Sequence, residues 1–380
     1  MEIVGGRVLG ADGATSERTL AIADGRIAGC GGGDGRWDAG GLLVLQGLVD
    51  INGDAFERQL MPRPGVQFPY RLALLETDRQ LVANGITTAY HGLTWSWEPG
   101  LRSAEAAHDF RAALTRERAR LAADTRLHLR FEIVCLDAVD EVERWIGECA
   151  VDLLAFNDHI DHILAIAKNP DKLAVYTART GMGPEAFLRQ LDRLNARRPE
   201  VPAAVARLAA AARTAGVPMI SHDDETPAMR AAYDDLGCRI SEFPVDPATA
   251  EAARARGNPI VLGSPNVLRG GSHCGRMGAA DAVAAGLCTI LTSDYYYPAM
   301  LQAAFRLASA RTVSLAQAWR LVSANPAAAV GLDDRGEIAP GKRADLVIVD
   351  DSDPAAPQVV ATFVAGRLVY AACDALRRVA

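Results

Sequence analysis

The sequence predicts an α/β protein, a (β/α)8 TIM barrel with a small β domain formed by both termini. Three observations lead to this fold class. The middle of the 380-residue chain alternates eight short apolar segments with alanine-rich stretches, which is the order that a parallel barrel requires. Both ends of the chain hold short β-prone runs separated by glycines. No G-x-G-x-x-G motif follows an apolar segment, so a dinucleotide-binding sheet has little support.

The β domain is predicted from residues 1–46 and 335–380. Its β-prone segments lie at residues 20–27, 344–350 and 358–370. The pair Asp24-Gly25 divides the first of these segments and favours a hairpin turn. Because similar short β-prone runs return at the C-terminus, we expect the two ends to form one small domain beside a barrel of residues 47–334.

Eight apolar segments of the middle region are the predicted barrel strands, and helices are expected between them. The strands are predicted at residues 45–51, 87–91, 127–134, 153–156, 219–222, 239–243, 260–262 and 289–293. Alanine-rich segments such as residues 202–215 and 279–285 are typical of the intervening helices. Residues 181–200 are rich in charge, and we interpret them as an excursion from the barrel rather than as a linker between domains.

The composition is that of an ordinary soluble enzyme. The chain is 49% hydrophobic and 23% charged, and its apolar runs are far shorter than the roughly 20 residues that cross a membrane. No signal peptide is evident, and the seven cysteines form no C-x-x-C pair. We therefore expect a cytoplasmic protein with reduced thiols and no membrane partner. A net charge of −7 argues against nucleic-acid binding but does not exclude an anionic small molecule. The sequence leaves a homo-oligomer open.

Polar side chains follow the predicted strands at the point where each strand ends. They are Asp54, Glu132, His222, Glu242 and Asp294. Active sites of (β/α)8 barrels form at this end of the strands. Carboxylate and imidazole groups supply the oxygen and nitrogen donors that a divalent transition metal takes. The sequence therefore predicts a metal site, in which Asp294 accepts a proton from the attacking water and His222 is a second catalytic residue.

Each of these residues also has a purely structural alternative. Asp54 and Asp294 could cap the helices that follow them, and an isolated His222 could be a hydrogen-bonded core histidine. Glu132 could pair with a neighbouring base, and Glu242 could belong to a buried ion pair. We favour the metal interpretation because His222 lies within Ser-His-Asp-Asp at a strand end, where several donors converge.

A glycine-rich segment after the seventh strand is the best candidate for binding phosphate. Residues 263–273 read G-S-P-N-V-L-R-G-G-S-H. Glycines let backbone N–H groups converge on phosphate oxygens, and phosphate sites of barrels often form at this position. The candidate contacts are Asn266, Arg269, Ser272 and His273. The alternative is an ordinary glycine-rich loop.

Three further side chains are candidates for contact with the substrate. Arg58 and Arg63 stand in a proline-flanked segment after the first strand and could hold distal phosphates, although solvated arginines are the default interpretation. His159 follows the fourth strand. Together with the glycine-rich segment, these residues predict an anionic, phosphorylated small-molecule substrate.

Several longer motifs resemble a known family. The segments G-L-V-D-I-N-G-D, A-D-A-V-A-A-G-L-C-T-I-L-T-S-D and N-P-A-A-A-V-G-L-D-D-R-G-E-I-A-P-G-K-R-A-D-L-V-I-V-D are similar to those of the amidohydrolase superfamily. The segments G-D-A-F-E-R-Q, S-H-D-D-E-T, S-E-F-P and G-S-P-N-V-L-R-G-G-S-H resemble, more narrowly, its branch in phosphonate breakdown. The resemblance runs from the N-terminal β segment to about Asp350.

The resemblance implies a metal-dependent hydrolase with one or two divalent ions, which would be zinc, manganese or iron. It implies hydrolysis of α-D-ribose 1-methylphosphonate 5-triphosphate to the 5-phosphate and pyrophosphate. Two rival functions stay open, namely amide hydrolysis or deamination of another small molecule, and a non-catalytic barrel. Phosphate binding at residues 263–273 would argue against the first rival, and absence of bound metal would favour the second.

Asn52 departs from the family pattern, which has histidine there as the first half of the strand-one metal motif. The resemblance therefore makes Asn52 a metal-ligand position, although an amide oxygen is a weaker donor than an imidazole. Asn52 could be a natural variant, an engineered inactivating change or a sign that one of two metals is lost. Relatives with an altered first-strand motif and one metal occur in the superfamily, so this departure does not by itself mean an inactive enzyme.

Overall fold

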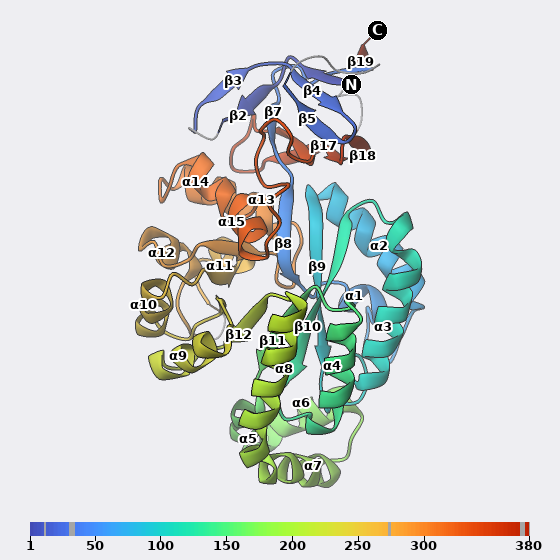
Figure 1. Ribbon diagram of the computed structural model, residues 1–380, viewed down its shortest axis with the longest axis vertical. Coiled ribbons are helices and arrows are strands. Elements are labelled where there is room, and N and C mark those ends of the chain that lie inside the picture. The colour runs from blue at the N-terminus through green and yellow to red at the C-terminus, as the bar shows by residue number, and fades with distance from the viewer. Residues whose placement is uncertain (11–12, 30–34, 273–274, 373–376, 380) are drawn as a thin grey trace.

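The computed structural model describes residues 1–380 apart from residues 11–12, 30–34, 273–274, 373–376 and 380. It has a β domain at one end, a parallel barrel in the middle and a helical extension at the other end (Figure 1). The predicted fold class is confirmed, because eight parallel strands with helices form the barrel and strands from both termini form the β domain. Among the described residues, no helix is long and apolar enough to span a membrane. A cytoplasmic location stays a prediction.

The barrel contains one strand from each predicted segment, and its strands neighbour one another in chain order. They are β8 (Leu48–Gly53), β9 (Ile86–Trp95), β10 (Asp124–Glu132), β11 (Leu153–Asn157), β12 (Met219–His222), β13 (Ile240–Glu242), β14 (Ile260–Gly263) and β15 (Ile290–Thr292). The sheet closes where Asp294 N donates to Asn52 O and Asp54 N donates to Asp294 O, each at 3.0 Å. Asp50 strengthens this seam by accepting from Ser293 N at 3.0 Å and from Ser293 Oγ at 2.6 Å.

Helices cover the outer face of the barrel. They are α1 (Glu57–Leu60), α2 (Tyr70–Ala83), α3 (Ala104–Glu117), α4 (Val139–Gly147), α8 (Val201–Ala215), α9 (Pro227–Leu236), α10 (Pro247–Ala255), α11 (Ser264–Arg269), α12 (Ala279–Ala284), α13 (Ala299–Ser309), α14 (Leu315–Arg320) and α15 (Ala324–Ala329). The sequence of α9 shows why such a helix begins and ends where it does. The Thr226 side chain accepts from Met229 N at 3.1 Å, and Gly237 ends the helix with a φ of 97°, which favours glycine.

The β domain consists of two sheets built from both ends of the chain. One has the order β19 (Arg377–Val379), β6 (Arg36–Asp38), β1 (Glu2–Val4), β4 (Leu20–Ala23), β5 (Arg26–Ala28), and the other β18 (Arg367–Ala371), β17 (Gln358–Val364), β16 (Leu346–Asp350), β7 (Leu43–Gln46), β2 (Arg7–Leu9), β3 (Thr15–Glu17). The predicted turn at Asp24-Gly25 is present, with φ of 51° and 74°. Buried Ile3, Val44 and Phe363 belong to one apolar cluster of this domain. The proposed domain limits stay predictions.

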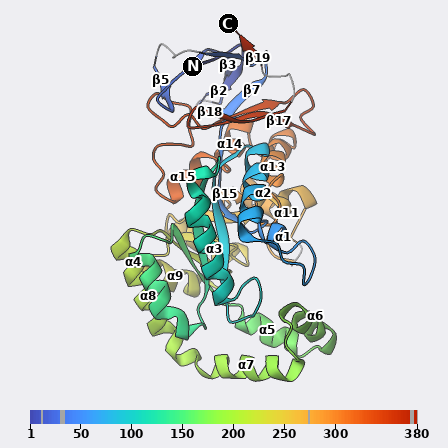
Figure 2. The same cartoon turned by 90° about the vertical axis from the view of Figure 1, so that its right-hand side faces the viewer.

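A helical extension follows β11 on the side of the barrel away from the β domain (Figures 1 and 2). It contains α5 (Ile160–Ala167), α6 (Pro170–Thr180) and α7 (Pro184–Ala196). Helix α7 buries Phe187 and Leu191 in the barrel's apolar core and exposes its charged residues. The excursion predicted at residues 181–200 is therefore helical, and it begins earlier in the chain, at Ile160.

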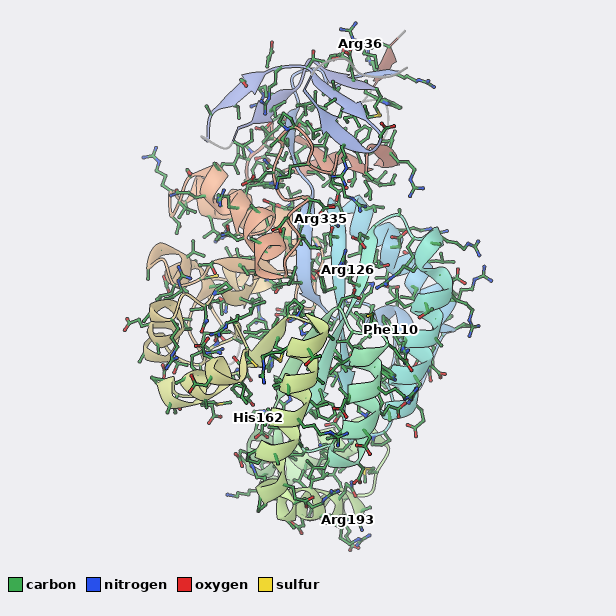
Figure 3. The ribbon with its side chains drawn as sticks, in the orientation of Figure 1. Arg36, Phe110, Arg126, His162, Arg193 and Arg335 are labelled. Carbon is green, nitrogen blue, oxygen red and sulfur yellow. The ribbon has the colours of Figure 1, made fainter. Side chains whose placement is uncertain are left out.

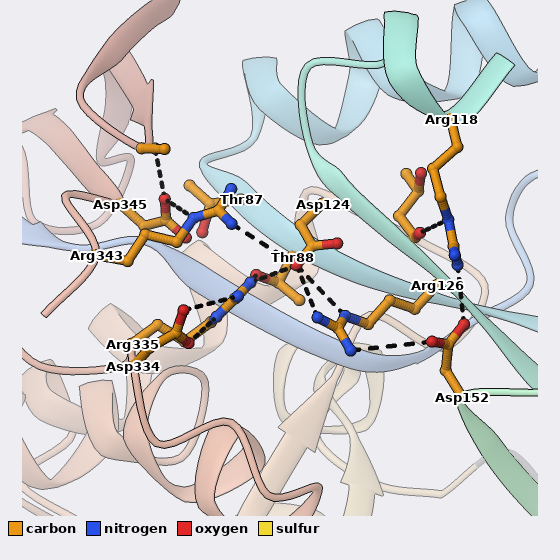
Figure 4. Close-up of polar contacts among 12 residues, drawn as sticks. Thr87, Thr88, Arg118, Asp124, Arg126, Asp152, Asp334, Arg335, Arg343 and Asp345 are labelled. Atoms are coloured by element: carbon orange, nitrogen blue, oxygen red, sulfur yellow. Dashed lines mark hydrogen bonds and ion pairs between the residues drawn. The ribbon is translucent and has the colours of Figure 1, made fainter. Parts of the chain in front are cut away.

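A network of ion pairs joins the base of the barrel to the chain that leads into the β domain (Figure 4). Arg335, whose side chain is only 4% exposed, donates to Thr88 Oγ1 and to Asp124 Oδ2, each at 2.7 Å. Arg126 also donates to Asp124 Oδ2, at 3.0 Å. Although burial raises the pKa of Asp124, the charges of Arg126 and Arg335 bring it below its usual value. This partly buried carboxylate is therefore well compensated.

Candidate active site

The predicted strand-end residues gather at the mouth of the barrel, which is the end that faces the helical extension. Asn52, Asp54, Glu132, His222, Glu242 and Asp294 stand at or near the ends of β8, β10, β12, β13 and β15. Figure 3 labels Arg335 near the base and His162 on the extension, on opposite sides of this mouth. Parallel strands bring their C-terminal ends to one edge of the barrel, which is why residues far apart in the sequence meet here.

Two imidazoles at the mouth are each held by a buried glutamate. His159 Nδ1 donates to Glu132 Oε1 at 2.5 Å, and His222 Nδ1 donates to Glu242 Oε2 at 2.6 Å. Burial raises the pKa of both glutamates, but the neighbouring histidines bring the pKa of each below its usual value. The two rings lie 5.4 Å apart between centroids. Because Nδ1 is used in both rings, Nε2 is the nitrogen left for a ligand.

Asp223 was not predicted to belong to the site, but it completes a group of possible metal donors with His159 and His222. One donor atom from each of His159, His222 and Asp223 lies within 4.8 Å of the others, close enough to hold a metal ion. Asp223 follows β12 with a φ of 55°, and its Oδ1 lies 3.7 Å from His222 Nε2. Arg276 Nη1 donates to the same oxygen at 2.5 Å. His159, predicted to contact substrate, thus lies among the candidate metal donors.

Arg130 is another residue at the mouth that was not predicted from the sequence to belong to the site. Its Nη1 donates to Asn52 Oδ1 at 3.5 Å, and its Nη2 lies 3.3 Å from His222 Nε2. Gly92 on β9 makes room for both side chains, because a Cβ there would lie 2.7 Å from Asn52 Oδ1 and 3.3 Å from Arg130 Cδ. Asn52 Nδ2 is buried and has no hydrogen-bond partner among the described residues.

Asp294 and Asp54 form an acidic pair where β8 meets β15. Burial and then the charge of Asp54 raise the pKa of Asp294 to about 7, against the opposing charge of Arg130. Burial also raises the pKa of Asp54. Gly263 leaves room for the Asp294 carboxylate, since a Cβ there would lie 2.7 Å from Asp294 Oδ2. A proton acceptor that is half ionised near neutral pH is suited to general base catalysis.

Neither aspartate caps a helix, so the structural alternative for these two residues is not seen. The helix after Asp294 is α13, which has Pro298 at its N-cap. The helix after Asp54 is α1, which has Phe56 at its N-cap and no side-chain capping hydrogen bond. Both carboxylates are therefore available to the mouth of the barrel.

Part of the glycine-rich segment forms a short helix rather than the ordinary loop that was the alternative interpretation. Helix α11 covers six of its residues, because Pro265 suits the first helical turn and Gly270, with a φ of 79°, ends the helix. Asn266 Oδ1 accepts from Ala279 N at 2.9 Å, which connects α11 to α12. Phosphate binding by this segment, including Ser272, stays a prediction, and His273 lies outside the described residues.

The three arginines predicted to hold phosphate lie at the rim. Arg269 is exposed, and its Nη1 lies 3.4 Å from the Tyr295 hydroxyl. Arg58 is exposed and lies over the Tyr296 ring, 5.9 Å from its centroid. Arg63 is also exposed. These positions match the default expectation of solvated arginines, and contact with a phosphorylated substrate stays a prediction.

A pocket of about 520 Å³ opens beside the His159 imidazole. Its lining includes Arg102, Glu132, His159, Arg198, Asp223 and Arg276. Arg198 donates to Asp158 and to Asp161, each at 2.6 Å. Arg102 donates to both carboxylate oxygens of Glu57 at 3.1 Å. Six carboxylates also line the pocket, so an anionic ligand would meet guanidinium groups whose charge neighbouring carboxylates already balance.

Comparison with known proteins agrees with this architecture. The amidohydrolase family model matches residues 280–370. Alpha-D-ribose 1-methylphosphonate 5-triphosphate diphosphatase from Escherichia coli (strain K12) is 33% identical over 349 residues, which cover 88% of this chain and 89% of that protein. A crystal structure of 5-methylcytosine deaminase from Klebsiella pneumoniae is 16% identical, with a TM-score of 0.63 over 98% of each chain. N-acetylglucosamine-6-phosphate deacetylase from Pasteurella multocida is 11% identical, with a TM-score of 0.63 over 98% of this chain and 99% of that one.

These similarities differ in what they show. The two crystal structures share the barrel and the β domain at low identity and support the fold alone. The likeness to the diphosphatase extends over nearly the whole chain at an identity that shows common family membership. The chain therefore belongs to the amidohydrolase superfamily and is a hydrolase related to the diphosphatase of phosphonate metabolism.

Proposed function

We propose that the chain hydrolyses α-D-ribose 1-methylphosphonate 5-triphosphate to the 5-phosphate and pyrophosphate. The observation that carries this proposal is the likeness to the E. coli diphosphatase over 88% of the chain. The mouth of the barrel supports it, because imidazoles, acidic residues and arginines meet there beside a pocket of about 520 Å³. Fold alone would not distinguish this reaction from deamination.

The donor groups at the mouth fit a divalent metal ion. His159, His222 and Asp223 would hold it, with Glu132 and Glu242 orienting the two imidazoles through Nδ1. Carboxylates commonly orient metal-binding histidines in this way. This set shares only His222 with the ligands predicted from the sequence, which were Asn52, Asp54, Glu132, His222, Glu242 and Asp294. When bound, zinc, manganese or iron would polarise a water molecule and a phosphoryl oxygen.

Asp294 is the proposed acceptor of the proton from the attacking water. Burial raises its pKa to about 7, so the carboxylate form is present at neutral pH and gains a proton readily. The water oxygen forms a bond to the phosphorus nearest the ribose, and the bond from that phosphorus to the next bridging oxygen breaks. Pyrophosphate leaves with the electron pair, and arginines that line the pocket are the proposed contacts for its charge.

Release of pyrophosphate from the ribose triphosphate by the purified, metal-loaded protein tests this function. Ammonia release from adenine and cytosine is measured in parallel. We expect His222→Ala to lower both turnover and bound metal at least about 100-fold, because loss of a residue that only orients a metal ligand already costs about 10–100-fold. The matched control is His108→Ala, since His108 is a half-exposed histidine of α3 that pairs with Glu141 at 3.1 Å.

The outcomes separate the proposed reaction from its rivals. Pyrophosphate release by the wild type and by His108→Ala, with loss in His222→Ala, would support the proposal. Ammonia release without pyrophosphate release would replace it with deamination. Absence of both products would favour a non-catalytic barrel.

A further inference from the structure

Arg130 lies among groups that could otherwise take a second metal ion. Its guanidinium contacts Asn52 Oδ1 at 3.5 Å and His222 Nε2 at 3.3 Å. Its Nε is buried and has no hydrogen-bond partner within the described part of the chain. A partly buried cation with so few hydrogen bonds is unfavourable unless nearby negative charge compensates it.

Three carboxylates supply that compensation. Asp54, Glu242 and Asp294 all lie near enough for the charge of Arg130 to lower their pKa. Asp54 and Asp294 stand where β8 meets β15, away from the donors on the strand ends of β11 and β12. One guanidinium therefore provides, on this side of the mouth, the positive charge that a metal ion would otherwise provide.

Asn52 suits an arginine better than it suits a metal ion. Its amide oxygen accepts from Arg130, whereas an amide is a weak ligand for a transition metal. Gly92 leaves the space in which the two side chains meet. The residue types at these three positions therefore agree with a guanidinium at this place.

We propose that the Arg130 guanidinium takes the place of a second cation, so that the chain binds one divalent ion rather than two. This inference rests on the proposed function, because it concerns the same site. An ion at His222 Nε2 would take the place of the Arg130 contact with this nitrogen, and Arg130 would keep its contact with Asn52. Repulsion between like charges then keeps a second divalent ion away from Asp54 and Asp294.

Counting bound Mn²⁺ tests the proposal without an activity assay. Full-length protein is treated with chelator, desalted and titrated with Mn²⁺, and the free ion is measured by electron paramagnetic resonance. Mn²⁺ is a suitable probe because it prefers oxygen and nitrogen donors to cysteine thiols. The proteins are the wild type, Asn52→His, and Asn52→His/Arg130→Met, in which methionine retains an unbranched side chain without the charge.

A matched control removes a different arginine of the mouth. Arg102 lines the pocket but is held by both oxygens of Glu57 at 3.1 Å, so Asn52→His/Arg102→Met should behave like Asn52→His. We expect one Mn²⁺ per chain for the wild type, Asn52→His and this control, and two for Asn52→His/Arg130→Met.

Two results would contradict the proposal. Two ions in the wild type would overturn it directly. Two ions in Asn52→His would also overturn it, since Asn52 rather than Arg130 would then exclude the second ion. Neither result depends on the folding of a double variant. No ion in the wild type would overturn the proposed metal site itself, whereas two ions would leave that site standing.

Discussion

Two aspartates at opposite ends of the barrel have pKa values that are shifted in opposite directions. At the base, burial raises the pKa of Asp124, but the charges of Arg126 and Arg335 bring it below its usual value. At the mouth, burial and the charge of Asp54 raise the pKa of Asp294 to about 7. The base thus stabilises the fold, whereas the mouth keeps a carboxylate in an unfavourable environment. Such a difference is expected where polar residues serve stability at one end of a barrel and chemistry at the other.

The largest expected effect on stability is at the base, from Arg335→Met. This change leaves Asp124 without one of its two close guanidinium partners, and we expect the free energy of unfolding to fall by roughly 2–4 kcal/mol. Urea unfolding followed by tryptophan fluorescence measures the change. Turnover per folded molecule should stay the same, because Arg335 lies far from the mouth. A loss of stability too small to measure would show that the base network contributes nothing.

At the mouth, Asp294→Asn should raise the free energy of unfolding of the metal-free protein, by an intermediate amount. The folded pKa is about 7 and the usual value is 3.8, so the folded chain holds a proton that the unfolded chain releases. The associated stability is present below pH 4 and is lost as pH rises through 7. At pH 8 the variant should therefore be more stable than the wild type by roughly 1–3 kcal/mol.

The pH dependence of this difference is its control. The gain in stability should shrink as the buffer is taken from pH 8 toward pH 5, and the variant should lose turnover. Asparagine tolerates the φ of 56° at this position. Lower stability than the wild type at pH 8, measured with chelator present, would mean that the charge of Asp294 is compensated after all.

The smallest effect on stability is expected from Arg118→Met. This variant allows an exposed arginine of the base to be compared with the buried Arg335. Arg118 donates to Asp152 at 2.9 Å, as Figure 4 shows, but its side chain is 47% exposed. Exposed ion pairs contribute little, so the free energy of unfolding should fall by less than about 1 kcal/mol. The same urea titration measures it. A loss as large as that of Arg335→Met would show that burial is not what distinguishes the two arginines.

The barrel strands could be predicted because their signals are local. Each of the eight apolar segments gave a strand within a few residues of the expected ends. The Asp24-Gly25 turn could also be predicted, because the pair Asp-Gly favours a two-residue hairpin turn. The helix at residues 264–269 was not predicted because the flanking glycines at 263, 270 and 271 favour a loop, whereas Pro265 favours the first turn of a helix.

The site could be predicted less completely, because its contacts join distant strands. The segment D-T-R-L-H-L-R-F-E of β10 alternates polar and apolar residues, and this pattern places Arg130 on the same face as Glu132. The partners of Arg130 lie 78 and 92 positions away, at Asn52 and His222. No local pattern shows which strands supply them.

Asp223 and Asp224 show a second limit of predicting the site from the sequence. Asp224 is fully buried and accepts from Ser221 Oγ and Ser241 Oγ, each at 2.7 Å. Asp223 instead adopts a φ of 55° and lies beside His222. Which aspartate reaches the mouth depends on one backbone angle, and Ser-His-Asp-Asp does not reveal that angle.

The two-ended β domain has a consequence for the synthesis of the protein. Strand β7 ends at Gln46 and its partner β16 begins at Leu346. At about 5–20 residues per second, a ribosome delivers β16 roughly 15–60 s after β7. During this interval one edge of β7 is unpaired, and open strand edges invite pairing with other chains. We expect the nascent chain to be most prone to aggregation in this interval, until its C-terminal strands emerge and cover that edge.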